Sequence, residues 1–162
     1  MKTLDLSDLS FLVVDDSVYM RKLMRTLLAG FGVRSVAEAD SADAAIESIR
    51  ASLPDIVLCD WEMPKRSGIS LLDEIRGSRQ KELRFMPVII VSGYSEQSRV
   101  QTARDHGANH YLVKPVSAAS LYSRIARTVL VEADFVEAGA FFGPDRRFRN
   151  EDEYDGEERR GR

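Results

Sequence analysis

The sequence is poor in metal-binding soft ligands: it has one cysteine, Cys59, and two histidines among its 162 residues. One cysteine cannot form an intramolecular disulfide, and this set of residues cannot build a cysteine-rich zinc site. No apolar run approaches the ~20 residues needed to cross a bilayer. The first ten residues mix Lys2, Asp5 and Asp8 with leucines, unlike a secretory signal peptide. We therefore expect a cytoplasmic protein without membrane insertion.

The chain also lacks a large excess of charge of one sign. Its formal net charge of -3 disfavours duplex nucleic acid as the default partner. Hydrophobic residues make up 44% of the sequence, which is enough for a buried core. From residue 131 onward, six arginines stand against ten acidic residues. We therefore predict an N-terminal lead over 1–8, one domain over 9–130, and a charged extension of helix and arginine-rich tail over 131–162.

Within 9–130, short apolar runs alternate with amphipathic stretches. The apolar runs predict strands at 11–14, 33–39, 56–59, 88–91 and 111–113. Cap residues and apolar spacing predict five helices. The first runs from the cap Ser17 to about Gly30 or Gly32, the second from the cap Ser41 through Ile49, and the third from Ile69 to Arg76. The fourth runs from Ser95 to Asp105, and the fifth from the cap Ser117 through Val129 as far as Val136. This alternation predicts an α/β fold, a parallel sheet with helices on both faces.

Polar residues follow four of the predicted strands, at the edge where such sheets bind ligands. They are Asp15 and Asp16, Asp60, Ser92, and Lys114. Three neighbouring carboxylates repel one another and require a cation, and their hard oxygen atoms suit Mg²⁺. Lys114 and Ser92 offer a positive charge and a hydroxyl donor, which the oxygens of a phosphoryl group need. We therefore expect the central carboxylate, Asp60, to be a nucleophile.

These residues, with the loop 60–64 (Asp-Trp-Glu-Met-Pro) and the pair Lys114-Pro115, resemble the receiver domain of two-component response regulators, the CheY-like family. The resemblance covers roughly residues 9–130. It implies a doubly wound, flavodoxin-like sheet of five parallel strands in the order 2-1-3-4-5. It also implies a role for each site residue: Asp60 as phosphoacceptor, Asp16 as direct Mg²⁺ ligand, Asp15 as water-mediated ligand, Glu62 as ligand through its backbone carbonyl, Ser92 as switch hydroxyl, Lys114 as phosphoryl-binding lysine, and Tyr111 as the switch aromatic that swings inward.

The resemblance implies a signalling protein and not an enzyme. A sensor histidine kinase would donate the phosphoryl group, and the output would be a protein partner such as the flagellar motor. Two other interpretations stay open: a phosphate sink that only hydrolyses the phosphoryl group, and a ligand sensor that phosphorylation modulates. Glu62 and Tyr94 occupy positions that tune phosphoryl lifetime in the family.

The C-terminal extension contains a repeat with an offset of thirteen residues: aromatic, any, Gly, any, acid, Arg, Arg, any, Arg. One interpretation is a solvated tail whose acids neutralise its arginines. The other is a segment that orders on binding cyclic di-GMP, since arginine stacks on bases and forks onto phosphates. It resembles the arginine-rich extensions of a CheY-like subgroup that binds this ligand. The candidate ligand-binding residues are Arg146, Arg147, Arg149, Arg159, Arg160 and Arg162.

Overall fold

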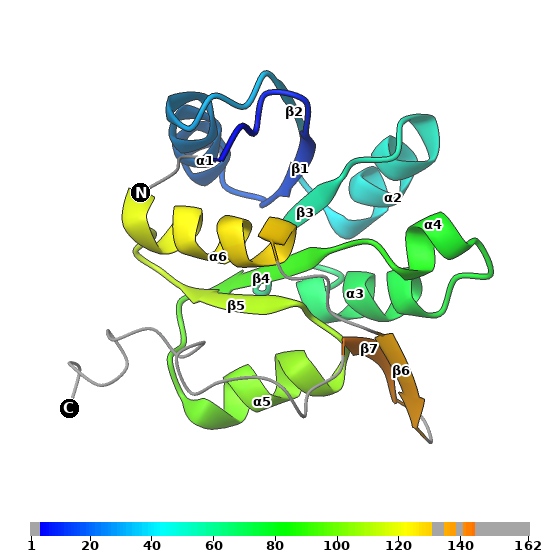
Figure 1. The fold of residues 1–162 in the computed structure, drawn as a ribbon. Helices are drawn as coiled ribbons and strands as arrows, with labels where there is room; N and C mark the ends of the chain where they lie inside the picture. Colours follow the sequence, from blue (N-terminus) through cyan, green and yellow to red (C-terminus); the bar gives the residue numbers. More distant parts are fainter. Residues whose placement is uncertain (1–3, 131–134, 139–140, 145–162) are drawn as a thin grey trace.

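The computed structural model describes residues 4–130, 135–138 and 141–144, and its main element is a five-stranded parallel sheet (Figure 1). The strand order is β2-β1-β3-β4-β5, as expected from the resemblance. The strands are β1 (Ser10–Val14), β2 (Ser35–Ala39), β3 (Ile56–Asp60), β4 (Val88–Ser92) and β5 (His110–Val113). The predicted doubly wound α/β fold is therefore confirmed.

The strand register aligns the carboxyl ends of neighbouring strands. Val14 at the end of β1 pairs with Cys59 of β3, Asp60 pairs with Val91 of β4, and Ser92 pairs with Val113 of β5. The residues that follow these positions consequently meet at one edge of the sheet. This register is what brings together side chains that lie up to about a hundred positions apart in the sequence.

Helices pack on both faces of the sheet. They are α1 (Val18–Gly30), α2 (Ala42–Ala51), α3 (Gly68–Arg76), α4 (Lys81–Arg84), α5 (Gln97–Asp105) and α6 (Ala118–Leu130). The predicted caps are confirmed: Ser17 accepts a hydrogen bond from the Met20 N–H, and Ser41 accepts one from the Ala44 N–H. No helix in the described part of the chain is both long and apolar enough to cross a membrane.

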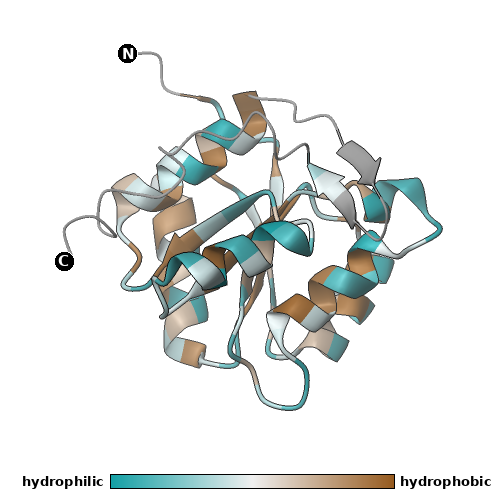
Figure 2. Ribbon diagram, turned by 90° about the horizontal axis from the view of Figure 1, so that it is seen from below, coloured by the Kyte–Doolittle hydropathy of each residue, from teal (hydrophilic) through white to brown (hydrophobic). Residues whose placement is uncertain are grey.

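The sheet separates two hydrophobic cores. On one face, α1 and α6 contribute Leu28 and Leu121, which are fully buried against alternate strand residues such as Phe11. On the other face, α2, α3 and α5 cover a second cluster that includes Leu72 and Ala103. Figure 2 shows the corresponding division of the helices into hydrophilic and hydrophobic faces. The predicted N-terminal lead joins the first core, because Leu6 is buried and the Leu4 N–H donates to the Tyr122 hydroxyl over 3.0 Å.

The prediction that the last helix runs to Val136 is wrong. Helix α6 ends at Leu130, and the chain forms strand β6 (Phe135–Ala138), which pairs antiparallel with β7 (Phe141–Pro144). Aromatic and β-branched residues such as Phe135 and Val136 favour a strand when a partner strand is available. Strand β7 lies beside α5 (Figure 1). The extension thus contains a hairpin that the helical spacing did not indicate.

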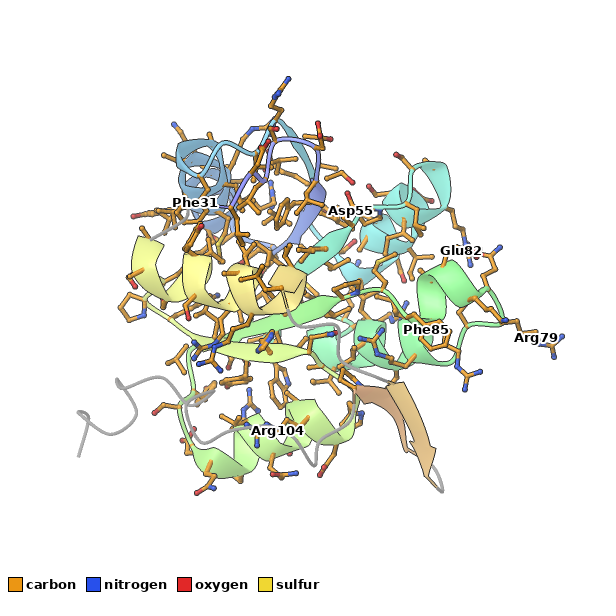
Figure 3. All side chains as sticks on the ribbon, viewed as in Figure 1. Phe31, Asp55, Arg79, Glu82, Phe85 and Arg104 are labelled. Carbon is orange, nitrogen blue, oxygen red and sulfur yellow. The ribbon has the colours of Figure 1, made fainter. Side chains whose placement is uncertain are left out.

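The short helix α4 was also not predicted. It lies between α3 and β4, in the region where Figure 3 labels Arg79, Glu82 and Phe85. Its four residues make a single turn, too short for a periodic apolar pattern to identify. Leu83 anchors this turn in the core, whereas Phe85 is exposed.

Candidate functional site: an acidic pocket at the strand ends

Three carboxylates form a cluster beyond β1 and β3. One oxygen atom from each of Asp15, Asp16 and Asp60 lies within 4.8 Å of the others. Asp15 and Asp60 are buried, whereas Asp16 is exposed. This set of oxygen ligands, with one side open to water, fits Mg²⁺, which retains several waters when bound by proteins. The cation site expected from the sequence is therefore present as a set of suitably placed ligands.

Lys114 supplies a positive charge beside both Asp60 and Asp15. Its Nζ lies 3.1 Å from Asp60 Oδ1 and 3.5 Å from Asp15 Oδ2. The backbone fixes this position, because the Lys114 N–H donates to the Ser92 carbonyl over 2.8 Å. The Lys114-Pro115 peptide bond is cis. Partial burial opposes the charged form of Lys114, but the hydrogen bond to Asp60 and the charges of both aspartates raise its pKa overall.

The Asp60 carboxyl is held in an unfavourable electrostatic position. Burial, followed by repulsion from Asp15, raises its pKa from 3.8 to about 6, although Lys114 acts in the opposite direction. One lysine therefore does not compensate for the clustered negative charges. A bound Mg²⁺ would supply the missing positive charge and would be held by Asp15, Asp16 and Asp60. Coordination by the Glu62 backbone carbonyl stays a prediction.

Gly68, at the start of α3, shapes the loop that carries Asp60. Its N–H donates to the Trp61 carbonyl over 2.9 Å, and a Cβ at this position would lie 2.2 Å from the Asp60 carbonyl oxygen. Only glycine permits this approach of the two backbone segments. The sequence interpretation did not identify Gly68. A signal was available, since glycine in the first turn of a helix is otherwise unfavourable.

Ser92 is fully buried at the end of β4, but its hydroxyl does not bond to Asp60. It donates to the Glu62 carboxylate, at 2.9 Å from Oε2 and 3.1 Å from Oε1. The Gly93 N–H adds a longer bond of 3.3 Å to Oε1. The sequence predicted that Glu62 acts as a ligand through its backbone carbonyl and influences phosphoryl lifetime, whereas the bond between its side chain and Ser92 is a finding of the structure.

Arg99, from α5, completes this contact. Its Nη2 donates to Glu62 Oε2, and its guanidinium lies 3.7 Å from the centre of the Trp61 ring and 4.6 Å from that of Tyr94. The sequence interpretation missed Arg99. Its spacing, four residues before the buried Ala103, indicates that it lies on the side of α5 that turns toward the sheet.

Tyr111 is buried in the same region. Its hydroxyl donates to the Tyr94 carbonyl, and its ring packs edge-to-face on Trp61 with 6.2 Å between centroids. Burial raises its pKa. The ring of Tyr111, the predicted switch aromatic, is thus buried while the Ser92 hydroxyl is bonded to Glu62.

The structure brings together most of the residues predicted for the site. They are Asp15, Asp16, Asp60, Glu62, Ser92, Tyr111 and Lys114. The second group of predicted residues lies outside the described part of the chain: Arg146, Arg147, Arg149, Arg159, Arg160 and Arg162.

Comparisons with known proteins agree with this geometry. The family described as response regulator receiver domain matches residues 11–126. The chain is 33% identical to chemotaxis protein CheY-3 of Vibrio cholerae over 118 residues, covering 73% of this chain and 89% of that protein. It is 32% identical to chemotaxis protein CheY of Pseudomonas aeruginosa over 119 residues, covering 74% and 94%.

Two solved structures have a fold similar to that of this chain. The CheX–CheY–BeF3–Mg complex from Borrelia burgdorferi contains a chain that is 27% identical, with a TM-score of 0.68, covering 76% of this chain and 90% of that one. A putative response regulator from Chloroflexus aurantiacus is also 27% identical, with a TM-score of 0.68 and coverage of 74% and 95%.

Proposed function

The chain belongs to the response regulator receiver domain family, and we propose that it is a phosphorylation-dependent signalling protein in which Asp60 is the phosphoacceptor. The observation that carries this proposal is the position of Asp60. Its buried carboxylate lies within 4.8 Å of an oxygen of each of Asp15 and Asp16, and 3.1 Å from the Lys114 ammonium. A carboxylate in this position can attack a phosphoryl group whose oxygens are neutralised by the lysine and by a cation held at the aspartates.

In the proposed reaction, a carboxylate oxygen of Asp60 attacks the phosphorus of a kinase phosphohistidine. The P–N bond breaks as the O–P bond forms, its electron pair stays on the ring nitrogen, and the histidine leaves as neutral imidazole because its other ring nitrogen already carries a proton. Lys114 would pair with an oxygen of the transferred group, and the Ser92 hydroxyl would donate a hydrogen bond to it after leaving Glu62. Bound Mg²⁺ supplies further neutralisation of the phosphoryl oxygens. The family resemblance supports a sensor histidine kinase as donor.

The output of the protein is proposed to be a protein–protein contact and not the turnover of a substrate. The named relatives from Vibrio cholerae and Pseudomonas aeruginosa are chemotaxis proteins, which supports a target in motility, such as the flagellar motor. Such a role places the protein in the cytoplasm. A phosphate sink is the alternative, and it would show rapid loss of the phosphoryl group without phosphorylation-dependent binding to any partner.

Incubation with acetyl phosphate and Mg²⁺, followed by mass spectrometry, tests the proposal. The wild-type protein should gain one phosphoryl group on Asp60, and Asp60→Asn should gain none. Asp43→Asn is a matched control, because Asp43 is exposed in α2 and outside the cluster. Phosphorylation of the Asp60→Asn protein, or failure of the wild-type protein to gain a phosphoryl group, would contradict the assignment.

We also propose that the arginine-rich tail binds cyclic di-GMP. The observation that favours this ligand is the repeated pattern of the tail, which uses arginine without lysine. Calorimetry of the intact chain and of a version ending at Pro144 tests the proposal, because the shorter version keeps both strands of the β6–β7 hairpin. Binding by the intact chain alone is the expected result. Equal heat from both versions, or none from the intact chain, would identify a solvated tail.

A further inference from the structure

The Ser92 hydroxyl has two competing acceptors at the strand ends. In the structure it donates to the Glu62 carboxylate, with its shorter contact at 2.9 Å. A serine hydroxyl carries one proton and donates to one group at a time, apart from shared contacts. To donate to a phosphoryl group on Asp60, the hydroxyl must first give up its bond to Glu62. The bond seen here therefore opposes the bond that phosphorylation requires.

Arg99 fixes the Glu62 side chain in the competing position. The Glu62 side chain is 37% exposed, and without Arg99 only the Ser92 hydroxyl and the Gly93 N–H would hold its carboxylate against movement into water. Arg99 pairs with Glu62 Oε2 and is itself held against the rings of Trp61 and Tyr94. Contact of a guanidinium with two ring faces is favourable and restricts its position. Glu62 is thereby held on Ser92 from the outside.

We propose that Arg99 is a positioning residue that keeps the Glu62 carboxylate on the Ser92 hydroxyl until Asp60 is phosphorylated. We call this pair the Glu62–Arg99 latch. The inference rests on the proposed phosphorylation of Asp60. A phosphoryl group adds negative charge beside the Glu62 carboxylate, and repulsion favours departure of that carboxylate. The Ser92 hydroxyl then turns to the phosphoryl group, and Arg99 is released from its pair.

The contacts of Arg99 suit a latch that opens. Another arginine, Arg76, shows what a permanent anchor looks like: it is buried and donates to three backbone carbonyls and to Asn109 Oδ1. Arg99 has one ion pair, and its Nε has no hydrogen-bond partner within the described residues. Partly exposed ion pairs contribute little to stability. Arg99 therefore holds Glu62 without locking it.

The position of Tyr111 shows which movement must still occur after Asp60 is phosphorylated. The ring is already buried, with its hydroxyl on the Tyr94 carbonyl. Inward movement of this ring is therefore not what keeps Ser92 from the phosphoryl group. The exchange of the Ser92 hydroxyl from Glu62 to the phosphoryl oxygen is the step that the latch controls.

A double-mutant cycle between Arg99 and Ser92 tests the latch. The probe is beryllofluoride with Mg²⁺, a stable phosphoryl analogue, and its affinity is measured by calorimetry on the full chain. Arg99→Gln should tighten binding about fivefold when Ser92 is present, because the hydroxyl no longer has to leave a fixed acceptor. In the Ser92→Ala background, Arg99→Gln should not tighten binding. Any direct attraction between Arg99 and the anion acts equally in both backgrounds and cancels in the cycle.

Arg104→Gln is the matched control. Arg104 lies in the last turn of the same helix, α5, so this change removes the same charge away from the latch (Figure 3). It should leave the affinity for beryllofluoride within twofold of the wild type. A shift of the Gly93 amide resonance in unligated Arg99→Gln, but not in Arg104→Gln, is also expected, because this amide donates to the carboxylate that Arg99 positions.

The outcomes separate the latch from the proposed function. Wild-type protein that fails to bind beryllofluoride would overturn both. Wild-type binding with equal effects of Arg99→Gln in the two Ser92 backgrounds would overturn the latch and leave the phosphoacceptor assignment standing. An unchanged Gly93 resonance in Arg99→Gln would show that Arg99 does not position Glu62.

Discussion

Replacing Asp60 with asparagine is expected to stabilise the metal-free protein while abolishing its proposed phosphorylation. The Asp60 carboxylate is 4% exposed and faces the buried Asp15 carboxylate. Asparagine has nearly the same shape and no charge, so it resembles the protonated acid. The substitution therefore removes the desolvation and repulsion that the ionised carboxylate suffers in the folded state.

The size of the effect follows from the pKa of Asp60, which rises from 3.8 to about 6 on folding. One pKa unit corresponds to about 1.4 kcal/mol, so the ionised form costs the fold on the order of 3 kcal/mol at neutral pH. Between these two pKa values the folded state binds more protons than the unfolded state, and stability falls as pH rises. The full cost is present above about pH 6, and it disappears below about pH 4.

Thermal unfolding in EDTA at pH 7.5 and pH 4 measures this difference. Asp60→Asn should unfold roughly 5 °C or more above the wild type at pH 7.5, and the gap should nearly close at pH 4. Added Mg²⁺ should narrow the gap at pH 7.5, because the ion binds only the folded wild-type site with its full set of ligands. The exposed control Asp43→Asn should not gain stability. An Asp60→Asn protein that is no more stable than the wild type, or whose advantage persists at pH 4, would refute the electrostatic reasoning.

Mg²⁺ should change the fluorescence of Trp61, the neighbour of Asp60, and Asp16→Ala should abolish the response; an unaltered titration would remove Asp16 from the ligand set. Gly68→Ala should lower the free energy of unfolding by roughly 1–3 kcal/mol and weaken Mg²⁺ binding, because the added Cβ collides with the Asp60 carbonyl. Gly30→Ala, where a Cβ meets nothing within 4 Å, should cause neither change in chemical denaturation. Arg76→Met should destabilise by about 3 kcal/mol or more, since several buried acceptors lose their donor, and equal stability would contradict this.

The parts of the fold that depend on local pattern could be predicted from the sequence. Apolar runs marked all five strands of the sheet, and Ser17 and Ser41 marked the starts of two helices. The end of α6 could not be found in this way, because residues 135–138 pair with a strand that the spacing of apolar residues does not reveal. Helix periodicity describes one segment at a time, whereas strand pairing depends on two.

The residues of the site that lie at the strand ends could also be predicted from the sequence, whereas the contacts made by the loop after Asp60 and by α5 could not. Asp15 and Lys114 directly follow β1 and β5, and Asp60 is the last residue of β3, so the parallel sheet itself places them at one edge. The contact between Glu62 and Ser92 depends on the path of the loop after Asp60, and that path depends on Gly68. Arg99 enters the site from a helix that follows a different strand. Such contacts depend on the packing of a helix against a loop, which no short motif encodes.

The attachment of α5 differs between its two ends, and this difference bears on how a signal would leave the site. At its C-terminal end, the Gly107 carbonyl that follows the helix accepts a bond of 2.9 Å from Arg76, and His106 Nδ1 lies 2.6 Å from Asp73 Oδ1. At its N-terminal end, Glu96 makes no side-chain cap bond, and residues 93–98 are exposed.

The ion pair between Arg99 and Glu62 joins the N-terminal part of α5 to the site. In the proposed latch, release of this pair would free Arg99 in the first turn of α5 and would leave the hydrogen bonds at its last turn unchanged. Tyr94, whose ring contacts the Arg99 guanidinium, is 51% exposed just before the helix begins. A partner that binds the phosphorylated form more tightly would then contact the start of α5, because only a surface that differs between the two states can distinguish them.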